Sequence, residues 1–159
     1  MKDMTCPSPD YSGSGATIDD VVGYAEAYYE ASRTLRCTTK RGKAPSYAPF
    51  RLCALHATEL YLNAFLMHCG DSADRVRGRL HSLPDERFAT ILRLTKRTLQ
   101  NLEDITLRRE YLISRYGPEQ AANQSPINRL EATLGEVRTK VRKHLGREIC
   151  TPDTGGAEG

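Results

Sequence analysis

The 159-residue chain contains no tryptophan and no long uninterrupted hydrophobic run. No segment approaches the roughly 18 apolar residues of a membrane-spanning helix. The opening MKDMTCPSPDYSGSGA has no apolar stretch of signal-peptide length. These absences predict a cytoplasmic protein that does not enter a membrane.

Cysteines are few, and their spacing fits neither a disulfide framework nor a zinc site. The five cysteines are an odd number and form no Cys-x-x-Cys pair. Cys53, His56, His68 and Cys69 fall within one expected helix, whereas zinc ligands are grouped at short turn spacings. Motifs for phosphate-binding loops, zinc hydrolases, serine hydrolases and calcium loops are also missing. We therefore expect reduced thiols, no metal and no cofactor.

The composition is that of one compact domain with short tails. Apolar residues make up 39% of the chain and charged residues 27%, and the net charge of +3 is too small to indicate a polyanionic partner by itself. A domain of this size buries about 70% of its unfolded surface, so one core suffices. Residues 1–15 and 148–159 are rich in turn-forming residues and are expected to be flexible tails. The predicted domain therefore covers residues 16–147.

Hydrophobic spacing is helical throughout, and strand-like alternation and hairpin turns are absent. Apolar residues recur at steps of three and four, and capping residues mark the helix ends, with Ser125 expected to cap the last helix. Long helices are expected over residues 18–37, 47–68, 99–116 and 127–145, and a shorter one over residues 84–94. The sequence thus predicts an all-α fold, an antiparallel bundle of four long helices plus one or two short ones.

The expected helix over residues 47–68 is apolar on nearly every side except for one polar stripe. His56, Glu59 and Asn63 are spaced three and four residues apart, so they share one helix face. A buried polar group without a partner costs about 1 to 3 kcal/mol, and an ionised glutamate costs more. We therefore expect arginine or histidine side chains to face this stripe.

A basic bend follows this helix and supplies such side chains. Arg75, Arg77, Arg79 and His81 lie within seven residues. Arginine offers a planar fork of donors for phosphate oxygens, and an imidazole that titrates near neutral pH can accept or donate a proton. Together with Glu59, these residues predict a site suited to phosphodiester chemistry.

Three stretches, RLCALHATELYLNAFLMHCG, the arginine-rich turn ending at His81, and REYLISRYG, resemble the HEPN superfamily of small helical bundles. The resemblance spans most of residues 18–145. Many members are metal-independent endoribonucleases with an arginine, four to six residues and then a histidine, and their two sites meet across a dimer interface. Arg75 and His81 fit this spacing. The resemblance therefore implies a homodimer with His81, Arg75, Arg77 and Glu59 as catalytic residues.

In such cleavage the ribose 2′-hydroxyl attacks the adjacent phosphorus while His81 moves a proton, an arginine holds the phosphate and Glu59 orients the pair. Two other interpretations of the same residues stay open. One is a non-catalytic, antitoxin-like module that binds RNA, a nucleotide or a protein partner. The other is a purely structural network of ion pairs.

Overall fold

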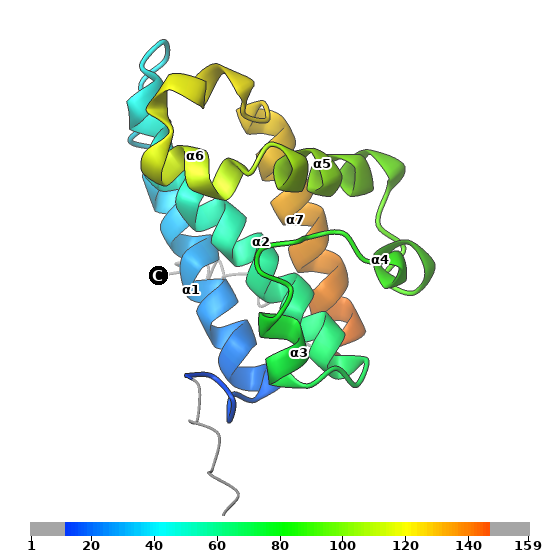
Figure 1. The fold of residues 1–159 in the computed structure, drawn as a ribbon. Helices are drawn as coiled ribbons and strands as arrows, with labels where there is room; N and C mark the ends of the chain where they lie inside the picture. The colour runs from blue at the N-terminus through cyan, green and yellow to red at the C-terminus, as the bar shows by residue number, and fades with distance from the viewer. Residues whose placement is uncertain (1–11, 147–159) are drawn as a thin grey trace, which may run out of the picture.

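The computed structural model describes residues 12–146, and all the regular secondary structure in that range is helical (Figure 1). No strand occurs among these residues, so the predicted all-α class is confirmed. Of the expected tails, residues 1–11 and 148–159 lie outside the described residues. The elements are α1 (Ile18–Arg36), the 3₁₀ turn η1 (Ala44–Tyr47), α2 (Ala48–His68), α3 (Ala73–Arg77), α4 (Glu86–Thr90), α5 (Lys96–Leu107), α6 (Glu110–Tyr116), the 3₁₀ turn η2 (Pro118–Asn123) and α7 (Ile127–His144).

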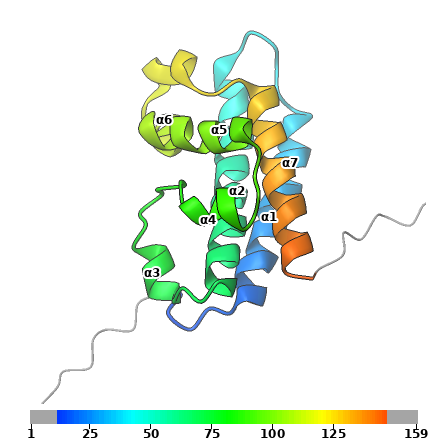
Figure 2. The ribbon, with the colours of Figure 1, turned by 90° about the vertical axis from the view of Figure 1, so that its right-hand side faces the viewer.

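Three long helices lie side by side, and the shorter α5 and α6 cross them (Figures 1 and 2). Helices α1 and α2 run in opposite directions, whereas α7 runs in the same direction as α2. Helix α2 lies in the middle and contacts α1, α7, α6 and α3. The arrangement therefore differs from the expected bundle, because no fourth long antiparallel helix is present in the described part of the chain.

Capping residues account for the ends of the first two long helices. The Thr17 hydroxyl accepts a hydrogen bond from the Asp20 N–H, and the Asp20 carboxylate accepts one from the Thr17 N–H, which closes a capping box before α1. After α2, Gly70 has φ +105° and its N–H donates to the Met67 carbonyl, while the Asp71 N–H donates to the Leu66 carbonyl. This is a Schellman cap, and it ends α2 where the sequence predicts.

The expected helix over residues 99–116 is divided at Arg109. This residue has φ +51°, a left-handed conformation that an L residue adopts at a cost and that stops a helix. Helix α5 ends at Leu107, and α6 starts at Glu110 as a separate helix. The prediction of one continuous helix is therefore wrong at this point.

The expected helix over residues 84–94 is shorter in the structure. Asp85 caps α4, which ends at Thr90, and Arg93 has φ +55°. Leu92 and Leu94 are both buried. Residues two apart on a helix point to nearly opposite sides, so leaving the helix lets both leucines enter the core.

The hydrophobic core surrounds α2. Complete burial of a large aliphatic or aromatic side chain contributes about 1.5 to 3 kcal/mol to folding. Helix α2 contributes most of these groups, and α7 contributes the apolar face that its three- and four-residue spacing predicts. The buried residues of the two helices include Phe50, Leu55, Tyr61, Leu62, Phe65, Leu66, Leu130, Leu134, Val137 and Val141.

A buried polar network holds α6 and the loop before α7 against α2. The Glu110 side chain is 0% exposed, and its Oε1 accepts hydrogen bonds from the Ser125 N–H at 2.7 Å and the Ser125 hydroxyl at 2.6 Å. Its Oε2 lies 3.8 Å from Nη1 of the buried Arg51. Nearby, the Asn101 amide donates to the Thr133 hydroxyl at 2.8 Å. Ser125 therefore donates hydrogen bonds to Glu110 and does not cap α7. The N-cap of α7 is Pro126, which makes no side-chain hydrogen bond. The predicted capping role of Ser125 is wrong.

Replacement of Glu110 by alanine is expected to lower the free energy of unfolding by about 3 to 5 kcal/mol, because Arg51 would remain buried without its counter-charge. Urea denaturation near neutral pH measures this change. Glu110→Gln keeps an acceptor for Ser125 and should cost less. Glu103→Ala, at an exposed position on α5, is the control. Wild-type stability in the alanine variant would contradict the assigned role of the network.

Candidate functional site

A groove of about 360 Å³ follows α2 on the side of α3 and the loop after it. The predicted polar stripe of His56, Glu59 and Asn63 lines this groove, and so do Arg77 and His81. The remaining wall is largely apolar and comes from α1, α2, α3 and the residues before α1. The structure therefore brings together three of the four predicted site residues, Glu59, Arg77 and His81.

Glu59 and His81 form the central pair of the groove. The Nδ1 of His81 lies 3.0 Å from the Oε2 of Glu59, which is hydrogen-bond distance. The side chains are 41% exposed for His81 and 22% exposed for Glu59. With Nδ1–H donated to the carboxylate, Nε2 is the acceptor nitrogen of the ring, and Nε2 has no hydrogen-bond partner within residues 12–146. The pair can therefore exchange a proton with a ligand in the groove.

The turn that carries His81 has a strained backbone and is held in place by hydrogen bonds. Leu80 and His81 have φ values of +48° and +67°, although neither is glycine. The Arg79 guanidinium spans the turn and donates hydrogen bonds to the carbonyls of Leu83 at 2.8 Å and Pro84 at 3.1 Å. The Leu83 N–H donates to the Thr106 hydroxyl of α5. Arg79 thus holds the loop and is not directed at a ligand.

His56 supplies a second imidazole next to Glu59. Burial is the main cause that lowers the pKa of His56, the charges of Arg115 and His81 lower it further, and Glu59 opposes the shift. The ring packs edge-on against Tyr28 with centroids 4.4 Å apart. His56 is therefore neutral near pH 7 and contributes a hydrogen-bonding group without a charge.

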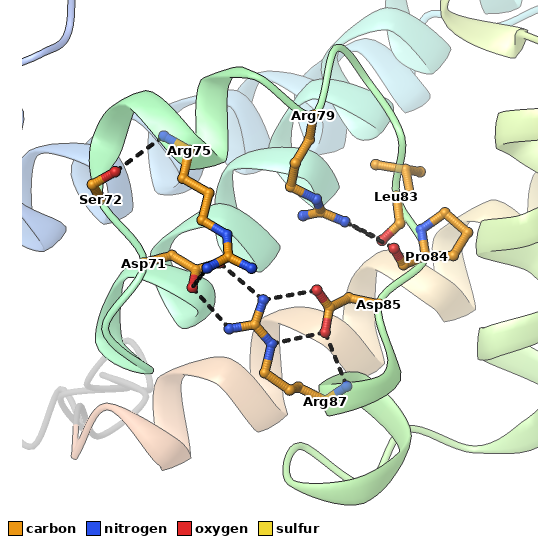
Figure 3. A network of polar contacts seen from close by, with 8 residues as sticks. All are labelled: Asp71, Ser72, Arg75, Arg79, Leu83, Pro84, Asp85 and Arg87. Carbon is orange, nitrogen blue, oxygen red and sulfur yellow. Dashed lines mark hydrogen bonds and ion pairs between the residues drawn. The ribbon is translucent and has the colours of Figure 1, made fainter.

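Two arginines of the predicted site point in different directions. Arg75 is 73% exposed, lies 3.8 Å from the Asp71 carboxylate (Figure 3) and does not line the groove. Arg77 lies on the groove wall, where its guanidinium is 3.6 Å from Asp74 and donates to the Ser12 carbonyl at 3.3 Å. The guanidinium that shares the groove with His81 therefore belongs to Arg77.

Arg87 is the centre of a separate ion-pair network that joins α4 to the end of α2 (Figure 3). Its guanidinium donates to both oxygens of Asp71 at 3.0 and 2.9 Å and to both oxygens of Asp85 at 2.8 Å. Hydrogen bonds from Arg87 lower the pKa of Asp85 to about 2 and also lower the pKa of Asp71. The basic segment therefore contributes to structure as well as to the groove.

Sequence reasoning missed Tyr111 of α6. Its ring is stacked on the His81 ring with centroids 4.4 Å apart and an interplanar angle of 29°. The residues are far apart in sequence, and a tyrosine at helical spacing is most often a core residue. The only indication in the sequence is its place in the REYLISRYG stretch that carries the resemblance.

Within residues 12–146, no group of three or more histidine, cysteine, aspartate or glutamate side chains is placed to hold a metal ion. Over the same residues, none of the helices combines the length and the apolar character that crossing a membrane requires. Comparison of the chain with protein-family models, curated proteins and solved structures finds no match. The interpretation of the site therefore depends on its own geometry.

The low pKa of Asp85 predicts a loss of stability in acid. Because the folded pKa is about 2 and the ordinary value is 3.8, the ionised group stabilises the fold above about pH 4, and this contribution disappears as the pH falls towards 2. After allowance for solvent screening, we expect about 1 kcal/mol. Urea denaturation at several acidic pH values should show a smaller pH dependence in Asp85→Asn, which keeps the helix cap. Asp74→Asn, at a largely exposed carboxylate, is the control, and equal pH dependence in wild type and Asp85→Asn would contradict the assignment.

Proposed function

We propose that this chain is a HEPN-like, metal-independent endoribonuclease whose catalytic pair is Glu59 and His81. The observation that carries the proposal is the 3.0 Å contact between Nδ1 of His81 and Oε2 of Glu59, on the wall of a groove that Arg77 also lines. A carboxylate that holds one imidazole nitrogen leaves the other free for proton transfer. A guanidinium in the same groove suits the phosphate whose bond is to be broken.

In the proposed reaction the ribose 2′-oxygen attacks the adjacent phosphorus and the bond from phosphorus to the 5′-oxygen breaks. Nε2 of His81 accepts the proton of the 2′-hydroxyl, and the resulting imidazolium returns a proton to the departing 5′-oxygen. Glu59 holds the ring and stabilises its charge. Arg77 stabilises the negative charge that develops on the phosphoryl oxygens. The products are a 2′,3′-cyclic phosphate and a 5′-hydroxyl.

Arg77 takes the phosphate-binding role in place of Arg75, although Arg75 has the spacing of the superfamily motif. Arg75 extends towards Asp71 outside the groove. Arg77 is 44% exposed on the groove wall. An arginine in this position keeps donors near the reacting phosphate and His81, which in-line cleavage requires.

The remaining parts of the proposal concern assembly and location. The resemblance implies a homodimer in which two sites lie close together, and the exposed Leu80, which lies next to His81 at the groove, is the apolar side chain that such an interface would cover. Cys37 and Cys69 are free thiols at exposed positions, which supports a reducing, cytoplasmic location. The all-helical class and the polar site on the central helix support HEPN-like membership.

His81→Ala is expected to lower the cleavage rate of a single-stranded oligoribonucleotide in EDTA by about 10²- to 10⁴-fold, because proton transfer to a positioned base contributes this much. Glu59→Gln should lower kcat less, and Arg77→Ala should lower kcat by removing a phosphate donor. Product ends identified by mass spectrometry should be cyclic phosphate and 5′-hydroxyl. The matching DNA should not be cut, because DNA lacks the 2′-hydroxyl.

Arg75→Ala is the matched control, since it removes the same charge from the same short helix without touching the groove. Unchanged cleavage by His81→Ala would contradict the catalytic assignment. Salt-sensitive RNA binding without new ends would replace it with the non-catalytic binding module. Coupling between Glu59 and His81 in thermal melting, with neither binding nor cleavage, would indicate a structural pair.

Replacement of the exposed Leu80 by aspartate is expected to convert the dimer to a monomer, because a charge would be buried in the interface. Light scattering at micromolar concentrations measures the change. The exposed Leu107→Asp, on the opposite side of α5 from the core, is the control. A monomeric wild-type protein would contradict the proposed dimer.

A further inference from the structure

Helix α6 lies beside the catalytic pair but contributes none of the residues of the predicted site. Figures 1 and 2 show α3 near one end of α2 and α6 near the other. Arg77, at the end of α3, lines the part of the groove that is next to α3. The loop that carries His81 lies between the two helices in the chain, and the His81 ring rests on Tyr111 of α6.

Tyr111 is placed to fix the orientation of the His81 ring. The stacked rings, with centroids 4.4 Å apart and an interplanar angle of 29°, restrict rotation of the imidazole about its side-chain bonds. The Glu59 carboxylate fixes the same ring through Nδ1. One hydrogen bond leaves the ring free to tilt, whereas a hydrogen bond and a stacked neighbour together define its plane.

Arg115 lies on the same face of α6 as Tyr111. Residues four apart on a helix are neighbours on its surface, so the Arg115 side chain starts one turn from the tyrosine that touches His81. Arg115 is exposed and forms no ion pair with any residue of the 12–146 range. The effect of its charge on the pKa of His56 agrees with this placement, because His56 lines the α6 end of the groove.

We propose that α6 completes the site, with Tyr111 as a positioning residue for His81 and Arg115 as a contact to a second phosphate of the RNA strand. This inference rests on the proposed ribonuclease function. Arg77 and Arg115 then flank the catalytic pair. With Arg77 and Arg115 each binding one phosphate, the substrate class is an oligonucleotide strand and not a mononucleotide.

The positioning role of Tyr111 is tested by kinetics and by imidazole nitrogen NMR of the full chain. Tyr111→Ala should lower kcat at least tenfold with little change in KM, and Tyr111→Phe should keep wild-type kcat because stacking needs the ring and not the hydroxyl. At a pH where the imidazoles are neutral, the nitrogen shifts of His81 should show the Nδ1–H tautomer in wild type and Tyr111→Phe, and a tautomer mixture in Tyr111→Ala. Tyr116→Ala, at an exposed tyrosine of α6, is the control.

Arg115 is tested by substrate length. Arg115→Ala should raise KM for a single-stranded tetranucleotide several-fold, leave KM for a dinucleotide unchanged, and reduce the salt dependence of binding to a 2′-O-methyl oligonucleotide by about 0.7 in the logarithmic slope. Arg33→Ala, at an exposed arginine of α1, removes equal charge as a control.

The outcomes separate this inference from the function on which it rests. If wild type does not cut RNA but Tyr111→Ala still mixes the tautomers, the ribonuclease proposal fails and the positioning role of Tyr111 stands. Unchanged kcat and tautomer in a folded Tyr111→Ala variant overturn that role. Equal effects of Arg115→Ala and Arg33→Ala, or no RNA binding by wild type, overturn the second phosphate contact.

Discussion

The enclosure of α2 is the constraint on which the rest of the structure depends. Because neighbours cover this helix on nearly every side, its polar side chains need partners inside the protein. Thr58 donates to the Ala54 carbonyl of the same helix, and three others take partners from the elements that cover them. The Tyr61 hydroxyl donates to Glu26 of α1 at 2.7 Å, Arg51 lies against Glu110 of α6, and Glu59 meets His81 from the loop after α3. Since an unmatched buried charge costs several kcal/mol, these pairs determine which element lies on which side of α2. The candidate site differs from the other two pairs in that its histidine is 41% exposed and the Nε2 of this ring has no partner among residues 12–146.

Arginine use explains why a basic segment alone does not identify an anion site. The guanidinium fork that suits a phosphate suits a carboxylate or a pair of carbonyls equally well. Arg87 binds two aspartates, Arg79 binds two loop carbonyls, and Arg138 of α7 binds Glu26 at 2.9 Å while lying over the Tyr29 ring. The fold therefore assigns most of these arginines to structure, and the distinction depends on partners that are distant in sequence.

Periodicity and capping predict the all-helical class, the starts of α1 and α2, the end of α2 and the polar stripe with its need for a histidine or arginine partner. These features depend on residues a few positions apart. The break at Arg109 could not be predicted, because no glycine or proline marks it. This break depends on the buried Glu110 carboxylate, which accepts hydrogen bonds from Ser125, a residue 15 positions away in the sequence. The stacking of Tyr111 on His81 likewise depends on how α6 turns after that break.

Backbone strain favours a functional over a purely structural interpretation of His81. A histidine that only bridges to Glu59 needs no unusual backbone, yet Leu80 and His81 both have positive φ values, at a cost of order 1 to 3 kcal/mol each. Gly78, which adopts such a conformation without this cost, lies three residues earlier with φ −62°. The chain instead holds the strained turn with the two hydrogen bonds of Arg79. Among residues 12–146 the other non-glycine residues with positive φ, Arg93 and Arg109, follow the ends of α4 and α5, whereas this turn places its strain at the imidazole whose Nε2 has no partner in the same range. A fixed ring orientation at that position matters for proton transfer.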